Sequence, residues 1–249
     1  MNWSHNFALT ASHQWGSILP EICLVVLAMS LLLIDVLGGR RIDRGLVARV
    51  AMTGQLLLVL VSLIALFGNE GRLDRETFSG MLVHSQFGQI MRFFFLASSV
   101  LVTYLGGIFL KKNPLPGTEF HAIWLLVTAG LMLLAQSNHF VMMFVALETV
   151  TVGFYVLVSY NRNLSNGLAA GLKYLILGGV STAILLMGLA LLYGIAESSS
   201  LEGSGGNAFK FDELCTFLAF NSENLVAMTG VLIVVAGIAF KIGTGPLQV

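Results

Sequence analysis

The stretch FVMMFVALETVTVGFYVLVSY, residues 140–160, decides the fold class because almost every residue in it suits a lipid environment. A helix of this length extends about 30 Å, which matches the hydrocarbon core of a bilayer. Glu148 lies near the middle of the stretch, where a carboxylate costs on the order of 3 kcal/mol on membrane-insertion scales. The stretch therefore predicts a transmembrane helix, and its acid marks a candidate functional site.

Composition puts the whole chain in the same class. Of its 249 residues, 56% are hydrophobic and 10% are charged, whereas soluble domains carry about 25% charged residues. The 13 basic residues balance the 13 acidic residues, so no basic field would attract nucleic acid. These features indicate an integral membrane protein whose partners include the lipid bilayer but no nucleic acid.

Hydropathy along the chain predicts an all-α, polytopic transmembrane helix bundle of about seven spans. The predicted spans are residues 18–37, 46–67, 89–110, 120–136, 140–160, 167–193 and 224–242, of which the fourth is the shortest. Between the last two spans, a Ser/Gly-rich loop precedes the segment DELCTFLAF, which predicts a short amphipathic helix.

The charge balance of the short loops predicts the orientation. Seven basic residues fall on one side and four on the other: Arg40, Arg41, Arg44, Arg49, Lys111, Lys112 and Arg162 against Arg72, Arg75, Arg92 and Lys210. Because cytoplasmic loops carry the excess of Lys and Arg, we expect a multi-pass protein of the cell inner (plasma) membrane with its N-terminus outside.

The two remaining basic residues, Lys173 and Lys241, lie within predicted spans. Counted from the loop between the fifth and sixth spans, Glu148 lies about 20 Å deep and Lys173 about 12 Å deep. A carboxylate and an ammonium hold their charges while close together and lose that support when they separate. Glu148, Lys173 and Lys241 are therefore a candidate proton pathway. The alternative is a static ion pair that only fixes helix packing.

Glycine and proline follow Lys241 closely. Gly243, Gly245 and Pro246 predict a break in the seventh helix, which is tolerated at membrane depth only beside protein or a watered cavity. The alternative is a Lys241 side chain that extends to the membrane surface.

Other polar residues give weaker signals. His121 and His139 flank opposite ends of the fourth span, so they cannot share a metal, and we expect both at the membrane interfaces. Glu21 and Asp35 lie near the ends of the first span, where we expect them to reach headgroup water. The sequence contains no nucleotide-binding motif and no metal-ligand spacing, so we predict no metal and no cofactor in this chain.

Four stretches carry a resemblance to a known family. They are ILPEICLVVLAMSLLLIDVLG, TEFHAIWLLVTAGLMLLAQSNHFVMMFVALETVTVGFYVLVSY, GLKYLILGGVSTAILLMGLALLYG and AGIAFKIGTGPLQV. Together they resemble the antiporter-like membrane subunits of bacterial NADH-quinone oxidoreductase (respiratory complex I). The LPE-type first helix is similar to that of subunit N rather than to its relatives L and M.

The resemblance implies a function for the three intramembrane charges. Glu148, Lys173 and Lys241 match the acid and the two lysines of the family's first proton half-channel. It implies a three-helix segment over residues 1–119 and an incomplete half-channel over residues 120–249. It also implies an enzyme complex in which other subunits hold FMN and iron–sulfur clusters, while this chain contacts other membrane subunits and binds no soluble substrate directly.

The chain departs from the family in two places. Thr149 to Gly153 replace the expected continuation after the acid, and the sequence stops at Val249, about half the family's length, so it resembles a subunit truncated to its N-terminal half. We expect a proton-translocating subunit of NADH-quinone oxidoreductase. The alternatives are a subunit of a cation/proton antiporter or of a membrane-bound hydrogenase complex, and a non-pumping structural membrane fragment.

Overall fold

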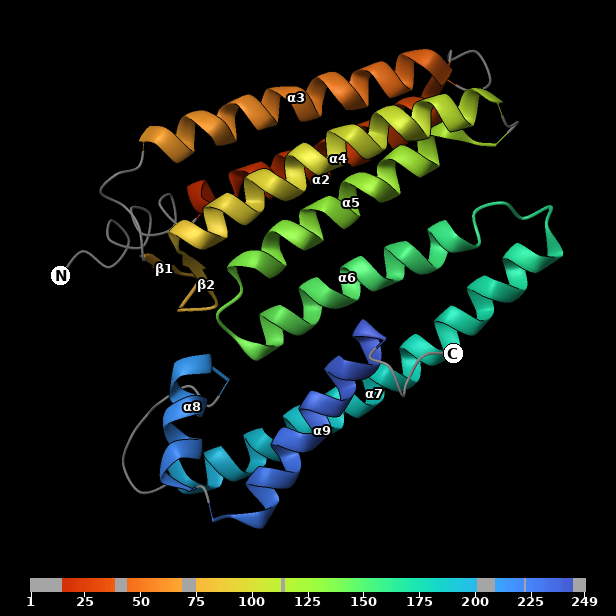
Figure 1. Ribbon diagram of the computed structural model, residues 1–249. Helices are drawn as coiled ribbons and strands as arrows, with labels where there is room; N and C mark the ends of the chain where they lie inside the picture. The colour runs from red at the N-terminus through yellow and green to blue at the C-terminus, as the bar shows by residue number, and fades with distance from the viewer. Residues whose placement is uncertain are drawn as a thin grey trace.

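The computed structural model in Figure 1 describes residues 15–38, 44–68, 75–112, 115–200, 209–221 and 223–243. Its helices are α2 (Leu19–Gly38), α3 (Arg44–Gly68), α4 (Gln86–Lys112), α5 (Gly117–Gln136), α6 (Phe140–Val158), α7 (Ser165–Ser200), α8 (Phe211–Phe220) and α9 (Leu225–Ile242). Strands β1 (Arg75–Thr77) and β2 (Leu82–His84) form an antiparallel hairpin between α3 and α4. The sequence predicts no hairpin here, because strands of three residues show no usable alternation of apolar and polar residues.

Seven helices in the described part of the chain are long and apolar enough to cross a membrane, namely α2 to α7 and α9. The predicted all-α polytopic bundle is therefore confirmed, and so is the short helix before the last span. Most helices differ by a few residues from the predicted spans, and two of the differences need comment. Helix α7 continues to Ser200 because the Ala and Glu that follow residue 193 favour a helix and no proline ends it. Helix α5 begins at Gly117, so α9, with 18 residues, is the shortest spanning helix.

Helices α2 to α5 lie side by side around one apolar core (Figure 1). Its buried side chains include Leu24, Leu31, Ala51, Leu96, Leu125 and Met132. Helix α6 runs along α5, and α7 and α9 pack against each other on the far side of α6 (Figure 1). The chain thus consists of a four-helix bundle and a helix pair, with α6 between them.

An ion pair closes the four-helix bundle at the end that carries the β-hairpin. The Arg92 guanidinium donates to both carboxylate oxygens of Glu21, at 2.8 Å from Nε and 2.6 Å from Nη2. Gln136 donates to the same carboxylate at 2.8 Å. Glu21 is only 2% exposed, so the prediction that it reaches headgroup water is wrong. It faces inward because α4 brings an opposite charge to it.

Close backbone contact holds α7 against α9. A Cβ atom added to Gly237 would lie 2.8 Å from the Leu185 nitrogen, and one added to Gly188 would lie 2.7 Å from the Val234 nitrogen. Both positions therefore need glycine, because no other residue lacks a Cβ. Across the same interface, Ser181 donates to the Gly237 carbonyl at 2.9 Å.

Backbone bridges connect the two parts of the chain at the hairpin end. Leu82 of the hairpin bridges to Ser137, and His139 bridges to Lys210 just before α8. The Lys210 ammonium also lies 3.0 Å from the Glu76 carboxylate, and hydrogen bonding to Glu76 raises the pKa of Lys210. The hairpin, the α5–α6 turn and the start of α8 thus form one hydrogen-bonded layer.

His84 lies at the base of this layer, where its Nδ1 is 3.0 Å from the Gln89 amide nitrogen. Burial and the nearby charge of Arg92 lower the pKa of His84 to about 4. The imidazole is therefore neutral at neutral pH and adds no second positive charge beside the Glu21–Arg92 pair.

The buried ion pair generates a stability prediction. The substitution Arg92→Met leaves the Glu21 carboxylate buried without its cation, and we expect a loss of about 3–5 kcal/mol, because removing one partner of a buried pair leaves an uncompensated charge. Thermal unfolding of the purified chain in detergent measures the effect.

The matched control is Lys112→Met, which removes an exposed cation from the far end of the same helix. We expect the control to unfold with the parent, and the double variant Glu21→Gln/Arg92→Met to recover part of the loss. An Arg92→Met chain as stable as the parent would contradict the assignment.

Candidate functional site

The candidate site is formed by an ion pair between α6 and α9. Glu148 lies about 12 Å along α6 from Phe140 and about 15 Å from Val158, near the middle of the span. Its carboxylate pairs with the Lys241 ammonium, although 93 residues separate the two in the sequence. Their side chains are 24% and 7% exposed, respectively. The structure therefore directs both charges toward the protein rather than toward lipid.

Thr182 of α7 completes the contacts of the acid. Its hydroxyl lies 2.8 Å from Glu148 Oε1 and 2.9 Å from the Gly178 carbonyl. A hydroxyl carries a single proton, so Thr182 donates either to the carboxylate or to its own helix, where Ser and Thr commonly bond the carbonyl four residues back. The Thr182 hydroxyl can therefore turn from one acceptor to the other when the charge of Glu148 changes. Sequence reasoning missed it because an intrahelical hydroxyl gives no distinctive pattern.

The end of α9 orients Lys241. The helix stops at Ile242, and Gly243 adopts a left-handed conformation with φ 69°, from which its N–H bonds the carbonyls of Ala239 and Phe240. Glycine is the residue that adopts this conformation without strain. The helix thus ends at the Gly243 cap, whereas Gly245 and Pro246 lie outside the described residues, so the predicted break in the helix stays a prediction.

Lys173 does not join this pair. Its side chain is exposed on α7, and within the described residues it has no ion-pair partner. Along α7, nine residues separate it from Thr182 at the level of Glu148, a rise of about 14 Å. The depth estimate from the sequence put Lys173 and Glu148 at similar but unequal depths, with a gap of about 8 Å that long side chains and water would bridge. The tertiary structure brings Lys241 to the acid instead.

The two histidines predicted at the membrane interfaces are buried within the protein. His139 is 3% exposed, accepts a bond from the Val141 N–H at the start of α6, and lies against the Phe209 ring. His121 is 1% exposed inside the four-helix bundle. Other segments of the chain cover both rings, which the sequence pattern of one span does not reveal, and their depth in the membrane stays a prediction.

A cavity of about 530 Å³ lies beside the ion pair. Lys241 and Gly243 form one side of it, and Thr151, Tyr155, Tyr174 and Ser181 add hydroxyl groups. We call it the lysine cavity. Polar lining of this kind can hold water molecules, which need two to four polar partners each.

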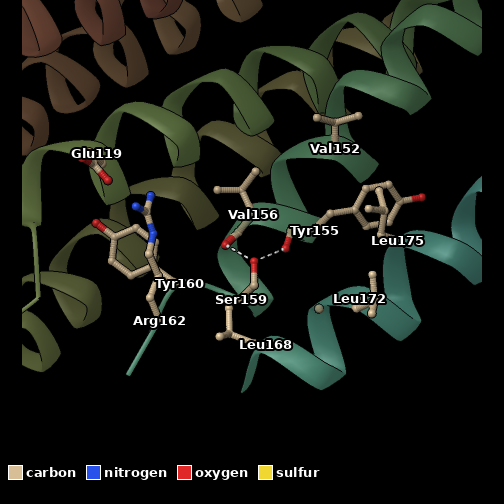
Figure 2. A pocket seen from close by; sticks show the side chains of 11 residues that line it. Glu119, Val152, Tyr155, Val156, Ser159, Tyr160, Arg162, Leu168, Leu172 and Leu175 are labelled. Carbon is tan, nitrogen blue, oxygen red and sulfur yellow. Dashed lines mark hydrogen bonds between the residues drawn. The ribbon is translucent and has the colours of Figure 1, made fainter. Parts of the chain in front are cut away.

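A second cavity, of about 400 Å³, extends from Tyr155 toward the loop between α6 and α7. Figure 2 shows Tyr160, Arg162 and Glu119 at one end of it and the Tyr155 ring beside Leu175 at the other. We call it the loop cavity. Burial and the nearby charge of Glu119 raise the pKa of Tyr160 to about 12, so this phenol stays protonated, and it donates to the Pro116 carbonyl. Tyr155 lines both cavities.

Comparison with known proteins finds relatives of this chain. Residues 137–249 match the family described as NADH:quinone oxidoreductase/Mrp antiporter, TM. Subunit N 1 of the NADH-quinone oxidoreductase from Opitutus terrae is 46% identical over 239 residues, which cover 95% of this chain and 46% of that protein. Along most of its length, the chain is therefore similar to part of this subunit N. Subunit N from Magnetococcus marinus is 30% identical over 92% of this chain and 45% of its own length.

Two solved structures share the fold of this chain. A chain of respiratory complex I from Thermus thermophilus with bound aureothin matches with a TM-score of 0.66 and 23% identity, over 92% of this chain and 45% of that one. A chain of the membrane-bound sulfane sulfur reductase, an archaeal respiratory membrane complex, matches with a TM-score of 0.71 and 19% identity, over the same shares. The chain spans about half the length of the curated relatives that it matches.

The pairing geometry can be tested by cross-linking. In a chain whose free cysteines, Cys23 and Cys215, are replaced by serine, we introduce Glu148→Cys with Lys241→Cys and treat membranes with a short bifunctional thiol reagent. We expect an intramolecular cross-link, detected by mass spectrometry after proteolysis. The matched control pairs Glu148→Cys with Lys173→Cys, which lie on different levels and should stay separate. Equal cross-linking of both pairs, or of the control alone, would contradict the geometry.

Proposed function

We propose that this chain is a proton-translocating membrane subunit of an NADH-quinone oxidoreductase, which couples electron transfer from NADH to quinone to proton movement across the membrane. The observation that carries the proposal is the Glu148–Lys241 ion pair between two spanning helices, next to a hydroxyl-lined cavity. The subunit N relatives supply the reaction class. In this proposal other subunits oxidise NADH with FMN and iron–sulfur clusters, and this chain holds no redox centre.

The chemistry of the pair is that of a proton held at the Lys241 Nζ atom. While Glu148 is charged and in contact, it stabilises the ammonium form, because an opposite charge favours the charged state of its neighbour. If a change elsewhere in the complex separates the pair, the lysine gives its proton to water in the lysine cavity. Moving one charge across 100 mV takes about 2.3 kcal/mol, which quinone reduction must provide.

Two cavities support a route to this proton site. The loop cavity begins near Arg162 and Tyr160, and Tyr155 separates it from the lysine cavity. We propose that protons enter from the loop and pass the Tyr155 hydroxyl before they reach Lys241. Lys173 is adjacent in sequence to Tyr174, which lines the lysine cavity, and we propose it as a further member of the route.

A cation/proton antiporter subunit is the second candidate. The matching family includes Mrp antiporters as well as NADH:quinone oxidoreductases. An ion pair of this kind is compatible with proton movement driven by quinone reduction and also with the exchange of cations for protons. The genes beside this one discriminate between them, because we expect the subunits of the complex to be encoded together.

The orientation proposed from the loop charges, with the N-terminus outside, has a direct test. Cys215 is exposed on α8, and the charge balance puts this helix on the outer side. We expect a membrane-impermeant thiol reagent to label Cys215 in intact cells. A Cys215→Ser chain is the control for background labelling. Labelling of the parent only after the membrane is opened would reverse the orientation.

Substitution of Glu148 tests the proposed function. We expect Glu148→Ala to assemble, because alanine favours helices, and to lose most quinone-linked proton uptake, because Lys241 loses its counter-charge. Glu148→Asp should retain more activity than Glu148→Gln because it keeps the charge. NADH oxidation and proton uptake in membranes at matched assembly levels give the result.

Three further variants sharpen this experiment. Glu197→Ala removes an exposed acid near the end of α7 and should behave like the parent. Lys241→Met should lose as much proton uptake as Glu148→Ala. Lys173→Met tests separately whether Lys173 belongs to the proton route. If Glu148→Ala assembles normally and pumps at the parental rate, the carboxylate has only a structural role and the proposal fails.

A further inference from the structure

The four-helix bundle α2–α5 contains a series of polar groups, buried except for Asp35, that the Glu148 site does not use. They follow one another along the bundle, from the hairpin end to the opposite end: Glu21, Arg92 and Gln136; Gln55, Ser99 and Thr128; Thr103; His121; and Thr118 with Asp35. We call the groups from Gln55, Ser99 and Thr128 to Asp35 the polar column.

The central level joins three helices. The Gln55 amide of α3 donates to Ser99 Oγ of α4 at 2.8 Å, and Ser99 Oγ lies 2.8 Å from Thr128 Oγ1 of α5. All three side chains are at most 1% exposed. This level lies near mid-membrane, because Thr128 is eight residues, or about 12 Å, from the end of α5 at Gln136.

Three residues of the column have polar atoms without protein partners. Within the described residues, neither ring nitrogen of His121 has a hydrogen-bond partner, and the same holds for Thr103 Oγ1 and Gln55 Oε1. His121 is 1% and Thr103 2% exposed. Buried polar groups in proteins normally bond to protein or to ordered water, because leaving them unsatisfied destabilises the fold.

The column reaches one membrane surface. His121 and Thr118 lie three residues apart on α5 and therefore share a helix face. The Thr118 hydroxyl donates to the Asp35 carboxylate at 3.1 Å, and Asp35 is exposed. Successive polar side chains from Asp35 to Ser99 are thus about 4 to 6 Å apart along the bundle axis.

An apolar layer closes the other side of the column. Ser99 lies seven residues from Arg92 on α4, a rise of about 10 Å. Leu96 and Met132 fill this interval, and both are 0% exposed. The Glu21–Arg92 pair is therefore separated from the column by packed hydrocarbon.

We propose that the polar column is a hydrated half-path, which admits water from the Asp35 end as far as Ser99 and Thr128 and is closed there by Leu96 and Met132. Its ligand is water, bound by the hydroxyl, amide and imidazole groups that have no protein partner. This path lies in α2–α5, apart from the Glu148–Lys241 site, and goes beyond the proposed function. It gives protons in water access to His121 from one side of the membrane only.

Cysteine accessibility on α4 tests the half-path. In the chain with serine at positions 23 and 215, we introduce Thr103→Cys, Ser99→Cys, Leu96→Cys or Leu101→Cys and treat membrane vesicles with a small hydrophilic thiol reagent. Leu101 is 60% exposed and faces lipid, so it is the matched control. Because the reagent attacks thiolate, which needs water, we expect positions 103 and 99 to react at least about tenfold faster than positions 96 and 101.

Three results would overturn the proposal, two from the cysteine variants and one from the unsubstituted chain. Reaction of positions 103 and 99 as slow as that of position 101 would show a dry structural network, and equally fast reaction of position 96 would show that no apolar layer closes the path. Hydroxyl-radical footprinting of the unsubstituted chain is the second readout and needs no variant to fold. Water beside His121 should lead to its oxidation, whereas an unmodified ring would count against hydration. Neither readout depends on NADH oxidation or proton uptake, so failure of this inference and failure of the proposed function are distinguishable.

Discussion

A carboxylate inside a hydrocarbon layer needs an opposite charge within reach, because lipid supplies neither a counter-ion nor hydrogen bonds. Two acids of this chain are under that constraint, and the fold meets it in different ways. Glu21 is held by both Arg92 nitrogens and by Gln136, an arrangement with several fixed partners. Within the described part of the chain, Glu148 has one cation, Lys241, and a hydroxyl that can turn away. The first arrangement suits stability, and the second suits a change of charge.

The two acids lie in different parts of the molecule. The four-helix bundle has a continuous core and a fully bonded ion pair at the hairpin end, whereas Glu148 lies at the boundary between α6 and the α7–α9 pair. Glycines bring α7 and α9 into backbone contact, and α7 packs more extensively on α9 than on α6. The proposed separation of Lys241 from Glu148 would therefore occur at the boundary with α6 and leave both cores packed. The hydrogen-bonded layer at the hairpin end joins both parts.

The polar residues of α4 and α5 illustrate what a linear pattern leaves open. Ser, Thr and Gln inside apolar spans are compatible with helix packing, with a water path or with back-bonding to the helix itself. Only the register between antiparallel helices puts Ser99 beside Thr128 and Gln55. The same register buries His121, although its position near the end of the span predicted that it lies at the membrane interface.

By itself, the sequence determined the seven spans and the short helix before the last one, because the cost of exposing polar groups to lipid acts on each segment separately. It predicted Glu148, Lys173 and Lys241 as intramembrane charges but put Glu21 in headgroup water and Arg92 in a loop. The glycines and the proline after Lys241 predicted a break in the last helix. The partner of each charge was decided by the tertiary structure. Glu148 meets Lys241 rather than Lys173, and Glu21 meets Arg92, because side chains far apart in the chain come together only when helices pack at a particular depth and rotation. Neither depth nor rotation is encoded in the hydropathy of a single helix.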